Sequence, residues 1–304
     1  MKIEKIYSTI DTHVAGEAFR IVKHSPIVLN EENIILNNEQ LQTYYQTEKS
    51  VLLNEPRGHR DMHGCIVVPS SVADFGVLFF NHDQNVQFQY GGLVATITAL
   101  LETGHLKQRE DQTYMIETID GIFCMKVTTN DLEVTSVYLE SDQCNVYQWE
   151  ENYQIISVDG KRDYALLTLP KEIPMIHLDY LSKINQWGKK MINRFVSLHS
   201  LDGIIVIEPI NGHENHVRSV TFMRDETILR SPGFDSTFAI LTALREKNKS
   251  IQQLSNESIF NSYLTAKPIS KDNRFSLETE GFITGIHEFV VDPDDPLQDG
   301  FILN

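Results

Sequence analysis

A tight turn that leads into a helix is the first feature of this sequence that could bind a ligand. Residues 230–246 read RSPGFDSTFAILTALRE, in which Pro232 and Gly233 break the chain and Ser236 and Thr237 can cap the helix that follows. The backbone amides of such a turn normally point at an anion. Its tip carries no cysteine, serine or histidine, so the sequence predicts a binding turn without an evident acid or base.

The segment GHRDMHGC is the densest group of titratable side chains. His59, Asp61, His63 and Cys65 alternate, so in a strand they would share one face. Side chains of these types on one face could hold a metal ion. The alternative is a segment that binds no metal, and spacing alone leaves both interpretations open.

Two further pairs are weaker candidates. His213 and His216 in NGHENH could bind a metal, but such a segment is more typical of a solvated loop. His82 and Asp83 form a local acid–base pair, although FFNHDQNVQ is more typical of an exposed turn.

Composition excludes several classes of protein. The 304 residues carry 42 acidic and 26 basic side chains, a formal charge of −16, which argues against nucleic acid or an anionic membrane surface as a partner. No apolar run reaches the roughly 18 residues of a membrane span, and the first residues lack the apolar core of a signal peptide, so we expect a cytoplasmic protein. Three cysteines without a CxxC spacing indicate neither a disulfide framework nor a zinc ribbon.

The elements that must position these residues form the same plan twice. Each half contains short β-type runs, then a glycine-bearing turn, then an apolar helix, which predicts two lobes of similar design. Strands are predicted over 2–11, 19–25, 64–70, 75–81, 113–129, 131–141, 153–160, 164–170, 203–209 and 217–223, and helices over 91–105, 177–195 and 236–249. Two further strand-like runs flank an acidic turn in the last residues, 282–304.

Five stretches in order resemble the proline racemase family, which includes proline racemase, 4-hydroxyproline 2-epimerase and trans-3-hydroxyproline dehydratase. They are IDTHVAGEAFRIV, EPRGHRDMHGCIVVP, LLETG, RSP and ITGIHEFVVDPDDPLQDGFIL, and they run nearly from end to end. The resemblance implies an α/β fold of two pseudo-symmetric lobes, each a sheet or barrel around a central helix as in diaminopimelate epimerase, with the ligand in a cleft between them. It places lobe boundaries at 1–147 with 283–304, and 148–282.

The resemblance also implies a chemistry. In active members one thiolate removes the α-proton of a proline-like substrate and a thiol of the other lobe protonates the opposite face, without pyridoxal phosphate or metal. The substrate carboxylate sits on backbone amides at the two helix N-termini. Because metal-free members share the GHRDMHGC segment, the resemblance favours His63 as a residue that lines the substrate ring, and it gives His13 and Glu17 a supporting role near the cleft.

The sequence departs from this pattern at every chemical position. Counting back from LLETG places Gln89 where the first catalytic cysteine or serine stands, and Gly233 takes the place of the second cysteine or threonine. Leu229 and Gly91 replace the Asp and His that hold the substrate amine. Because an amide and a glycine cannot exchange a proton near neutral pH, we expect standard racemase, epimerase and 3-hydroxyproline dehydratase activity to be absent.

Asp235 stands where the family has a small residue in the carboxylate-binding turn, so it would repel an anion and could attract a cationic group. Tyr90 could hydrogen-bond a ligand, but we expect it to fill part of the pocket. The predicted ligand-binding set is His63, Tyr90, Gly91, Gly92, Leu229, Gly233, Phe234 and Asp235.

Three hypotheses follow. The first is a protein that has lost this catalysis and keeps a pocket for a small amino-acid-like ligand. The second is a cofactor-independent isomerase or lyase with altered chemistry, using Asp235, His63 or His82 on a proline-like or other amino acid. The third is an ordinary racemase whose thiol is Cys65. Family members commonly pair as homodimers, so a homodimer is a further expectation.

Overall fold

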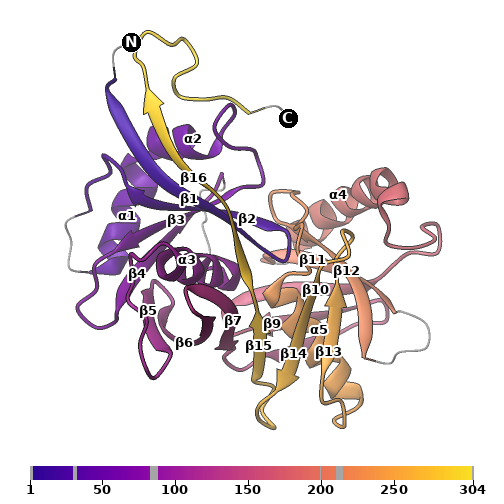
Figure 1. Cartoon of the computed structure of the whole chain (residues 1–304). Coiled ribbons are helices and arrows are strands. Elements are labelled where there is room, and N and C mark those ends of the chain that lie inside the picture. The colour runs from indigo at the N-terminus through magenta and orange to yellow at the C-terminus, as the bar shows by residue number, and fades with distance from the viewer. Residues whose placement is uncertain (1–2, 30–32, 83–87, 199, 210–214, 303–304) are drawn as a thin grey trace. The chain divides into compact units, whose positions relative to one another are not determined.

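The computed structural model describes residues 3–29, 33–82, 88–198, 200–209 and 215–302. The chain divides into two compact units, residues 1–137 with 280–304 (unit 1) and residues 138–279 (unit 2). Figure 1 labels their helices and strands.

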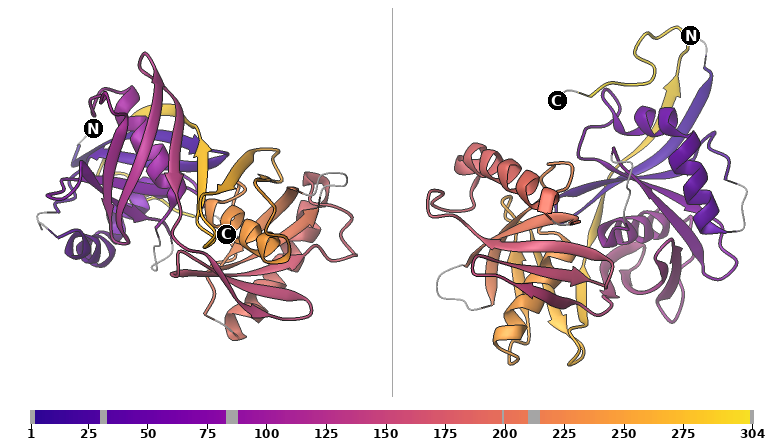
Figure 2. Two further views of the ribbon diagram at one scale, coloured as in Figure 1. Left: turned by 90° about the horizontal axis from the view of Figure 1, so that it is seen from below. Right: turned by 180° about the vertical axis from the view of Figure 1, so that it is seen from behind.

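Unit 1 is a sheet whose strands follow the order β16-β1-β2-β3-β4-β5-β6-β7, and β7 continues past the boundary of the unit. Its elements are β1 (Lys5–Val14), β2 (Glu17–His24), α1 (Ile34–Tyr44), α2 (Gln46–Leu53), β3 (His63–Val68), β4 (Phe75–Phe80), α3 (Tyr90–Glu102), β5 (Thr113–Thr118), β6 (Gly121–Asn130), β7 (Glu133–Glu140) and β16 (Gly281–Val291). Figure 2 shows β1 and β16, the first and last strands of the chain, side by side, and they pair antiparallel.

Unit 2 repeats this order as β8-β9-β10-β11-β12-β13-β14-β15. Its elements are β8 (Asn145–Trp149), β9 (Tyr153–Val158), β10 (Arg162–Thr168), the 3₁₀ helix η1 (Leu178–Tyr180), α4 (Leu181–Leu198), β11 (Gly203–Pro209), β12 (His216–Met223), α5 (Phe234–Lys247), β13 (Leu254–Glu257), β14 (Tyr263–Pro268) and β15 (Phe275–Thr279).

The two units match element by element. In unit 1, β2 and β3 are parallel, as are β4 and β5; in unit 2 the parallel pairs are β10 with β11 and β12 with β13. Helices α1 and α2 connect the first parallel pair and α3 the second, as α4 and α5 do in unit 2. The repeated plan predicted from the sequence is confirmed.

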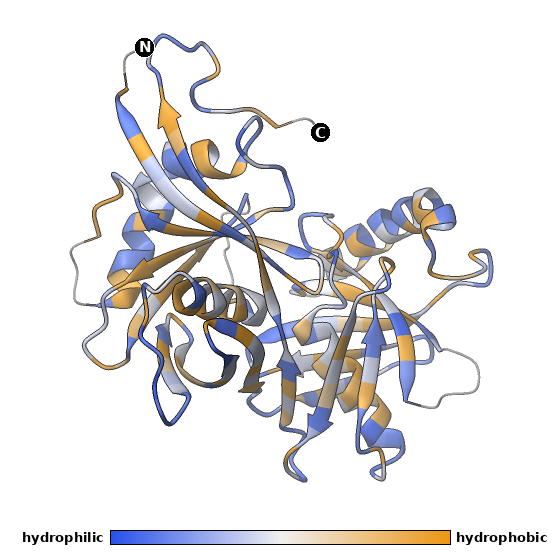
Figure 3. Cartoon of the chain, viewed as in Figure 1, coloured by the Kyte–Doolittle hydropathy of each residue, from blue (hydrophilic) through white to orange (hydrophobic). Residues whose placement is uncertain are grey.

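Each unit has a central helix that its strands cover. Helix α3 packs against β1, β2, β3 and β16, and all its residues from Tyr90 to Leu101 are buried because the helix is apolar on every side. Helix α5 packs against β8, β9, β10, β13 and β14. Figure 3 shows instead that polar and apolar residues alternate along α4, which contributes Ile184, Ile192 and Phe195 to the core of unit 2.

Three sequence expectations need correction. Helices α1 and α2 were not predicted, because IILNNEQLQTY and QTEKSVLL show little apolar periodicity. The run at the C-terminus forms one strand, β16, followed by turns and a single bridge from Phe301 to Glu55. Helix α5 begins at Phe234, so Ser236 and Thr237 lie inside its first turn and do not cap it.

Candidate functional site

The start of α3 places an amide beside a histidine. Gln89 is the N-cap residue of α3, but its side chain makes no capping bond. Its Nε2 lies 3.0 Å from Nδ1 of His63, whose Nε2 lies 3.1 Å from Oε1 of Glu17. Because an amide nitrogen can only donate, Nδ1 of His63 accepts and Nε2 donates its hydrogen to the Glu17 carboxylate. Both ring nitrogens of His63 are therefore engaged.

The fold explains why these side chains meet. Glu17 begins β2, His63 begins β3, and these strands are parallel and adjacent, with Phe19 opposite His63. Both side chains are largely buried, at 7% and 14% exposure. His63 and Gln89 were predicted to share one site, and the structure brings them together with Glu17.

The next residues of α3 are packing residues. Tyr90 is 2% exposed and lies edge-on to Phe88 at 4.7 Å and to Phe123 at 5.7 Å between ring centroids. A Cβ atom at Gly92 would meet Cε1 of Phe79 at 2.6 Å, so only glycine allows this close approach of helix and sheet. Gly91 is also buried. Tyr90 therefore fills an aromatic cluster inside unit 1.

None of the three thiols belongs to the residues that start α3 or α5, although Sγ of Cys65 lies 3.9 Å from the carbonyl oxygen of Gly92 in the first turn of α3. Cys65 is fully buried under α3, and burial raises the pKa of its thiol to about 12. Burial does the same at Cys144, whose pKa is also raised to about 12, whereas Cys124 is exposed on β6. A thiolate at Cys65 would be scarce near neutral pH, which argues against the hypothesis of an ordinary racemase that uses this thiol.

Because buried thiols resist ionisation, we predict that the free energy of unfolding falls at alkaline pH. Because the pKa of Cys65 is raised in the folded state from 9.0 to about 12, the stability it contributes is present below pH 9 and is lost as pH rises from 9 to 12. At pH 10 this loss is about 1.4 kcal/mol for one thiol. The free energy of unfolding is measured with urea at pH 8 and at pH 10. Its decrease between the two pH values should be smaller for Cys65→Ala than for the wild type. Equal losses would contradict the prediction, and Cys124→Ala is the control that should match the wild type.

The start of α5 differs from that of α3 because its N-cap residue is Gly233, which has φ 75° and ψ 132°. Residues with a side chain rarely adopt this backbone conformation. A Cβ atom here would lie 2.9 Å from Oγ of Ser236 and 3.2 Å from Cδ1 of Leu229. The backbone conformation and the close neighbours of this position therefore both favour glycine.

Buried hydroxyl and amide groups hold this turn in place. Oγ of Ser231 accepts from the amide of Gly233 at 3.1 Å, and Oγ1 of Thr237 donates to its carbonyl at 2.6 Å. Nδ2 of Asn256 donates to the carbonyl of Pro232 at 3.2 Å. Phe234, which follows the turn, is buried. The turn is thus fixed by its own unit.

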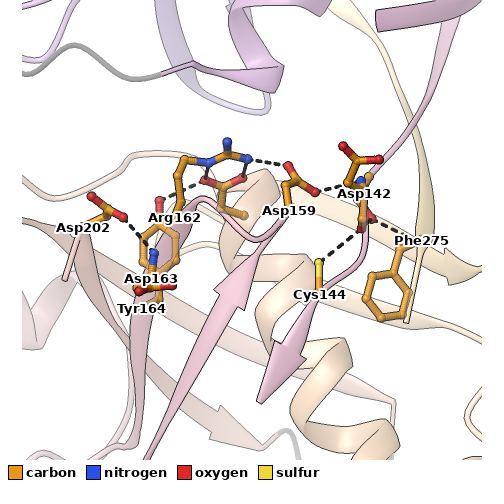
Figure 4. Close-up of polar contacts among 10 residues, drawn as sticks. Asp142, Cys144, Asp159, Arg162, Asp163, Tyr164, Asp202 and Phe275 are labelled. Carbon is orange, nitrogen blue, oxygen red and sulfur yellow. Dashed lines mark hydrogen bonds and ion pairs between the residues drawn. The ribbon is translucent and has the colours of Figure 1, made fainter. Parts of the chain in front are cut away.

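Asp235, the second residue of α5, is bound by an arginine from β10. Nε of Arg162 donates to Oδ2 of Asp235 at 2.7 Å and Nη2 donates to Oδ1 at 3.1 Å, while Oη of Tyr164 donates to Oδ2 at 2.9 Å. Nη2 of Arg162 also reaches Oδ2 of Asp159 at 2.6 Å, a contact drawn in Figure 4. The cationic partner of Asp235 is therefore Arg162, a residue of the same unit.

These partners keep fixed charge states. Burial, the largest influence, acts to lower the pKa of Arg162, but the charges of Asp235 and Asp159 outweigh it and the pKa is raised well above its usual value. Burial and then the charge of Asp235 raise the pKa of Tyr164 well above its usual value. Arg162 is therefore a permanent cation and Tyr164 a permanent neutral donor.

At each helix start a charged residue comes from the corresponding strand of its unit, but the two residues have opposite charges. Glu17 is the first residue of β2 and Arg162 is the first residue of β10, which is the matching strand of unit 2. Glu17 reaches Gln89 through His63, whereas Arg162 reaches Asp235 directly. Arg162 was not predicted from the sequence because its partner lies 73 residues away, and the only available signal was the new acid in the turn.

The remaining candidates lie in other surroundings. Nε2 of His82 bonds Oδ1 of Asn54 at 2.9 Å, and burial lowers the pKa of His82. His13 stacks on Phe282 at 5.1 Å, and His216 lies 3.4 Å from Glu257. Asp83 and His213 fall outside the described residues.

Within the described ranges, no group of three or more His, Cys, Asp or Glu side chains is arranged to hold a metal ion. Only His63 and Cys65 of the alternating set lie on β3, because His59 and Asp61 precede that strand. Across the same part of the chain, no helix is long and apolar enough to cross a membrane.

Comparisons with known proteins agree with this architecture. The family model described as proline racemase matches residues 9–161. The trans-3-hydroxy-L-proline dehydratase of Bacillus thuringiensis subsp. konkukian is 30% identical over 334 residues covering 100% of both chains. The proline racemase of Acetoanaerobium sticklandii is 25% identical over 99% of both chains. A crystal structure of a hydroxyproline epimerase from Agrobacterium vitis with bound trans-4-hydroxy-L-proline is 20% identical, covers 100% of this chain and 97% of its own, and has a TM-score of 0.84.

Proposed function

The chain belongs to the proline racemase family, and from that premise we propose that it binds a small amino-acid-like ligand without catalysing two-thiol proton transfer. The observation that carries the proposal is the pair of helix starts. The N-cap residue of α3 is an amide engaged with His63, and that of α5 is a glycine with φ 75°. Neither position offers a group that can take up or release a proton near neutral pH.

The thiols support the same proposal. Cys65 and Cys144 are buried with raised pKa values, and Cys124 lies on the exposed part of β6. General acid–base catalysis needs a group within hydrogen-bonding reach of the reacting proton and with a pKa near the working pH. The positions that carry catalytic thiols in active relatives have none in this chain.

Ligand binding is inferred from the relatives and from the preserved helix starts. The related proteins are named for reactions of proline and hydroxyproline, and one related structure holds trans-4-hydroxy-L-proline. The first-turn amides of a helix have no partners within the helix and favour polar or anionic groups. The proposed ligand is therefore a proline-sized compound.

A binding screen tests the proposal. L-proline, D-proline, the 3- and 4-hydroxyprolines and their carboxamides are each added to the wild-type protein, and melting temperature and ligand-observed NMR are measured. We expect at least one compound to bind and raise the melting temperature, because a ligand that binds only the folded state stabilises it. Absence of binding by every compound, while an active relative binds its substrate in parallel, would reject the proposal.

The second candidate function is altered chemistry based on His63. The Glu17 carboxylate orients the ring and leaves Nδ1 with its lone pair directed at Gln89. This arrangement resembles the orienting carboxylate and base of other enzymes, although Gln89 covers the basic nitrogen. A single base of this kind could remove an α-proton in an isomerase or lyase reaction. Gln89→Ala would uncover Nδ1 and is the variant that distinguishes this candidate.

A further inference from the structure

The start of α5 has the features of a carboxylate-binding site. The Arg162 side chain is 4% exposed, and its guanidinium presents two N–H groups to one carboxylate, the paired geometry that arginine uses for carboxylates. Tyr164 adds a hydroxyl donor, and the positive end of the helix dipole lies at the same place. The carboxylate that occupies the site belongs to Asp235 itself.

We propose that Asp235 is a built-in carboxylate that fills this site, so that the ligand group recognised here is a hydrogen-bond donor, an ammonium or carboxamide, and not a carboxylate. The second half of the proposal rests on the proposed function, whereas the first half concerns the protein alone. The ligand class is accordingly a cyclic amine or an amino-acid amide.

The acceptor capacity of Asp235 supports a donor as its ligand. An ionised carboxylate has about four acceptor positions. Oδ2 accepts from Arg162 and Tyr164, and Oδ1 accepts one bond from Arg162, so one position on Oδ1 receives no bond from any residue that the structure describes. The side chain is 17% exposed, so solvent reaches part of it.

Charge around the site also disfavours a second carboxylate. Arg162 is shared between Asp235 and Asp159, so the single positive charge of this trio meets two negative charges. Figure 4 shows that Asp142, Asp163 and Asp202 lie in the same region, and Asp163 donates its amide to Oδ2 of Asp202 at 2.7 Å. A carboxylate brought here would be repelled, and an ammonium group would be attracted.

Chemical rescue tests the first half. Asp235→Ala removes the carboxylate and leaves a space that a small anion can fill, so we expect a lower melting temperature that sodium acetate at about 100 mM restores in large part, by mass action on the folded state. Sodium chloride at equal ionic strength should restore little. The matched control is Asp235→Asn, whose amide keeps the space filled. Acetate should therefore not raise the melting temperature of this variant.

Two results would overturn the carboxylate assignment. One is failure of acetate to stabilise Asp235→Ala beyond chloride, and the other is equal rescue of the alanine and asparagine variants. If Asp235→Ala does not fold, Asp235→Ser replaces it, because serine leaves most of the space and adds a small polar group.

A ligand series tests the second half on the wild-type protein. Dissociation constants for L-proline, L-prolinamide and pyrrolidine are measured by titration, and we expect L-prolinamide or pyrrolidine to bind at least 10-fold more tightly than L-proline. Tighter binding of L-proline would overturn the ligand class while leaving the proposed function intact. Binding by none of the three or by any compound of the wider screen would reject the proposed function, and the acetate result would still decide the role of Asp235.

Discussion

Replacing Arg162 with methionine is expected to lower the free energy of unfolding by about 3–5 kcal/mol, the usual cost of removing one partner from a buried ion pair. The substitution would leave the carboxylates of Asp235 and Asp159 facing each other, with side-chain exposures of 17% and 4%, and without a compensating charge. Urea unfolding at neutral pH measures the loss. Arg162→Lys should lose less, because it keeps the charge and loses only the paired geometry.

The matched control is Lys249→Met in the same unit. Lys249 is 58% exposed and pairs with Glu246 on the surface, and such pairs contribute at most about 1 kcal/mol. If Arg162→Met lowers the free energy of unfolding no more than Lys249→Met does, the Arg162–Asp235 pair does not organise the start of α5. A large loss for Arg162→Met alone supports the central place of this pair in unit 2.

Introducing thiols at the two helix starts is expected to lower the stability of the protein without producing racemase activity. Gly233→Cys should cost about 1–3 kcal/mol, because φ 75° strains any residue with a side chain and its Cβ atom would lie 2.9 Å from Oγ of Ser236. The double variant Gln89→Cys with Gly233→Cys should not racemise L-proline, since the resemblance predicts that Leu229 and Gly91 stand at the positions that hold the substrate amine. Urea unfolding and chiral chromatography measure the two effects.

Gly160→Cys separates backbone strain from crowding. Gly160 has φ 66°, but a Cβ atom at this position would have no neighbouring heavy atom within 4 Å, so this variant should lose only the part due to strain. A Gly233→Cys variant as stable as the wild type, or a double variant that racemises proline, would contradict the prediction for these two helix starts.

The repeated plan could be predicted because its signals are local. Glycine-bearing turns precede apolar helices in both halves, and runs rich in β-branched and aromatic residues mark most strands. The same local rules missed α1 and α2, whose polar sequences are stabilised by packing residues such as Leu41 and Leu52 against β3 and β4.

The chemistry of the helix starts was predicted only in part. The resemblance to family motifs drew attention to Gln89, Gly233 and Asp235, which it predicts to stand at chemically important positions. Helix α5 begins at Phe234, directly after Gly233 with its positive φ. Capping rules predicted a start at Ser236 because that residue type favours the N-cap position. The contact of Arg162 with Asp235 joins distant segments and required the fold.

Exchange of the α-proton shows whether the protein removes a proton from a proline-like compound. The wild type, Gln89→Ala and an active relative are each incubated in deuterium oxide with L-proline, D-proline and the 3- and 4-hydroxyprolines, and the α-proton signal is followed by NMR. We expect the signal to persist with the wild type while the relative exchanges it. Loss of the signal with the wild type would show that the protein does remove the α-proton, and if His63→Ala then abolished that exchange, His63 would be identified as the base.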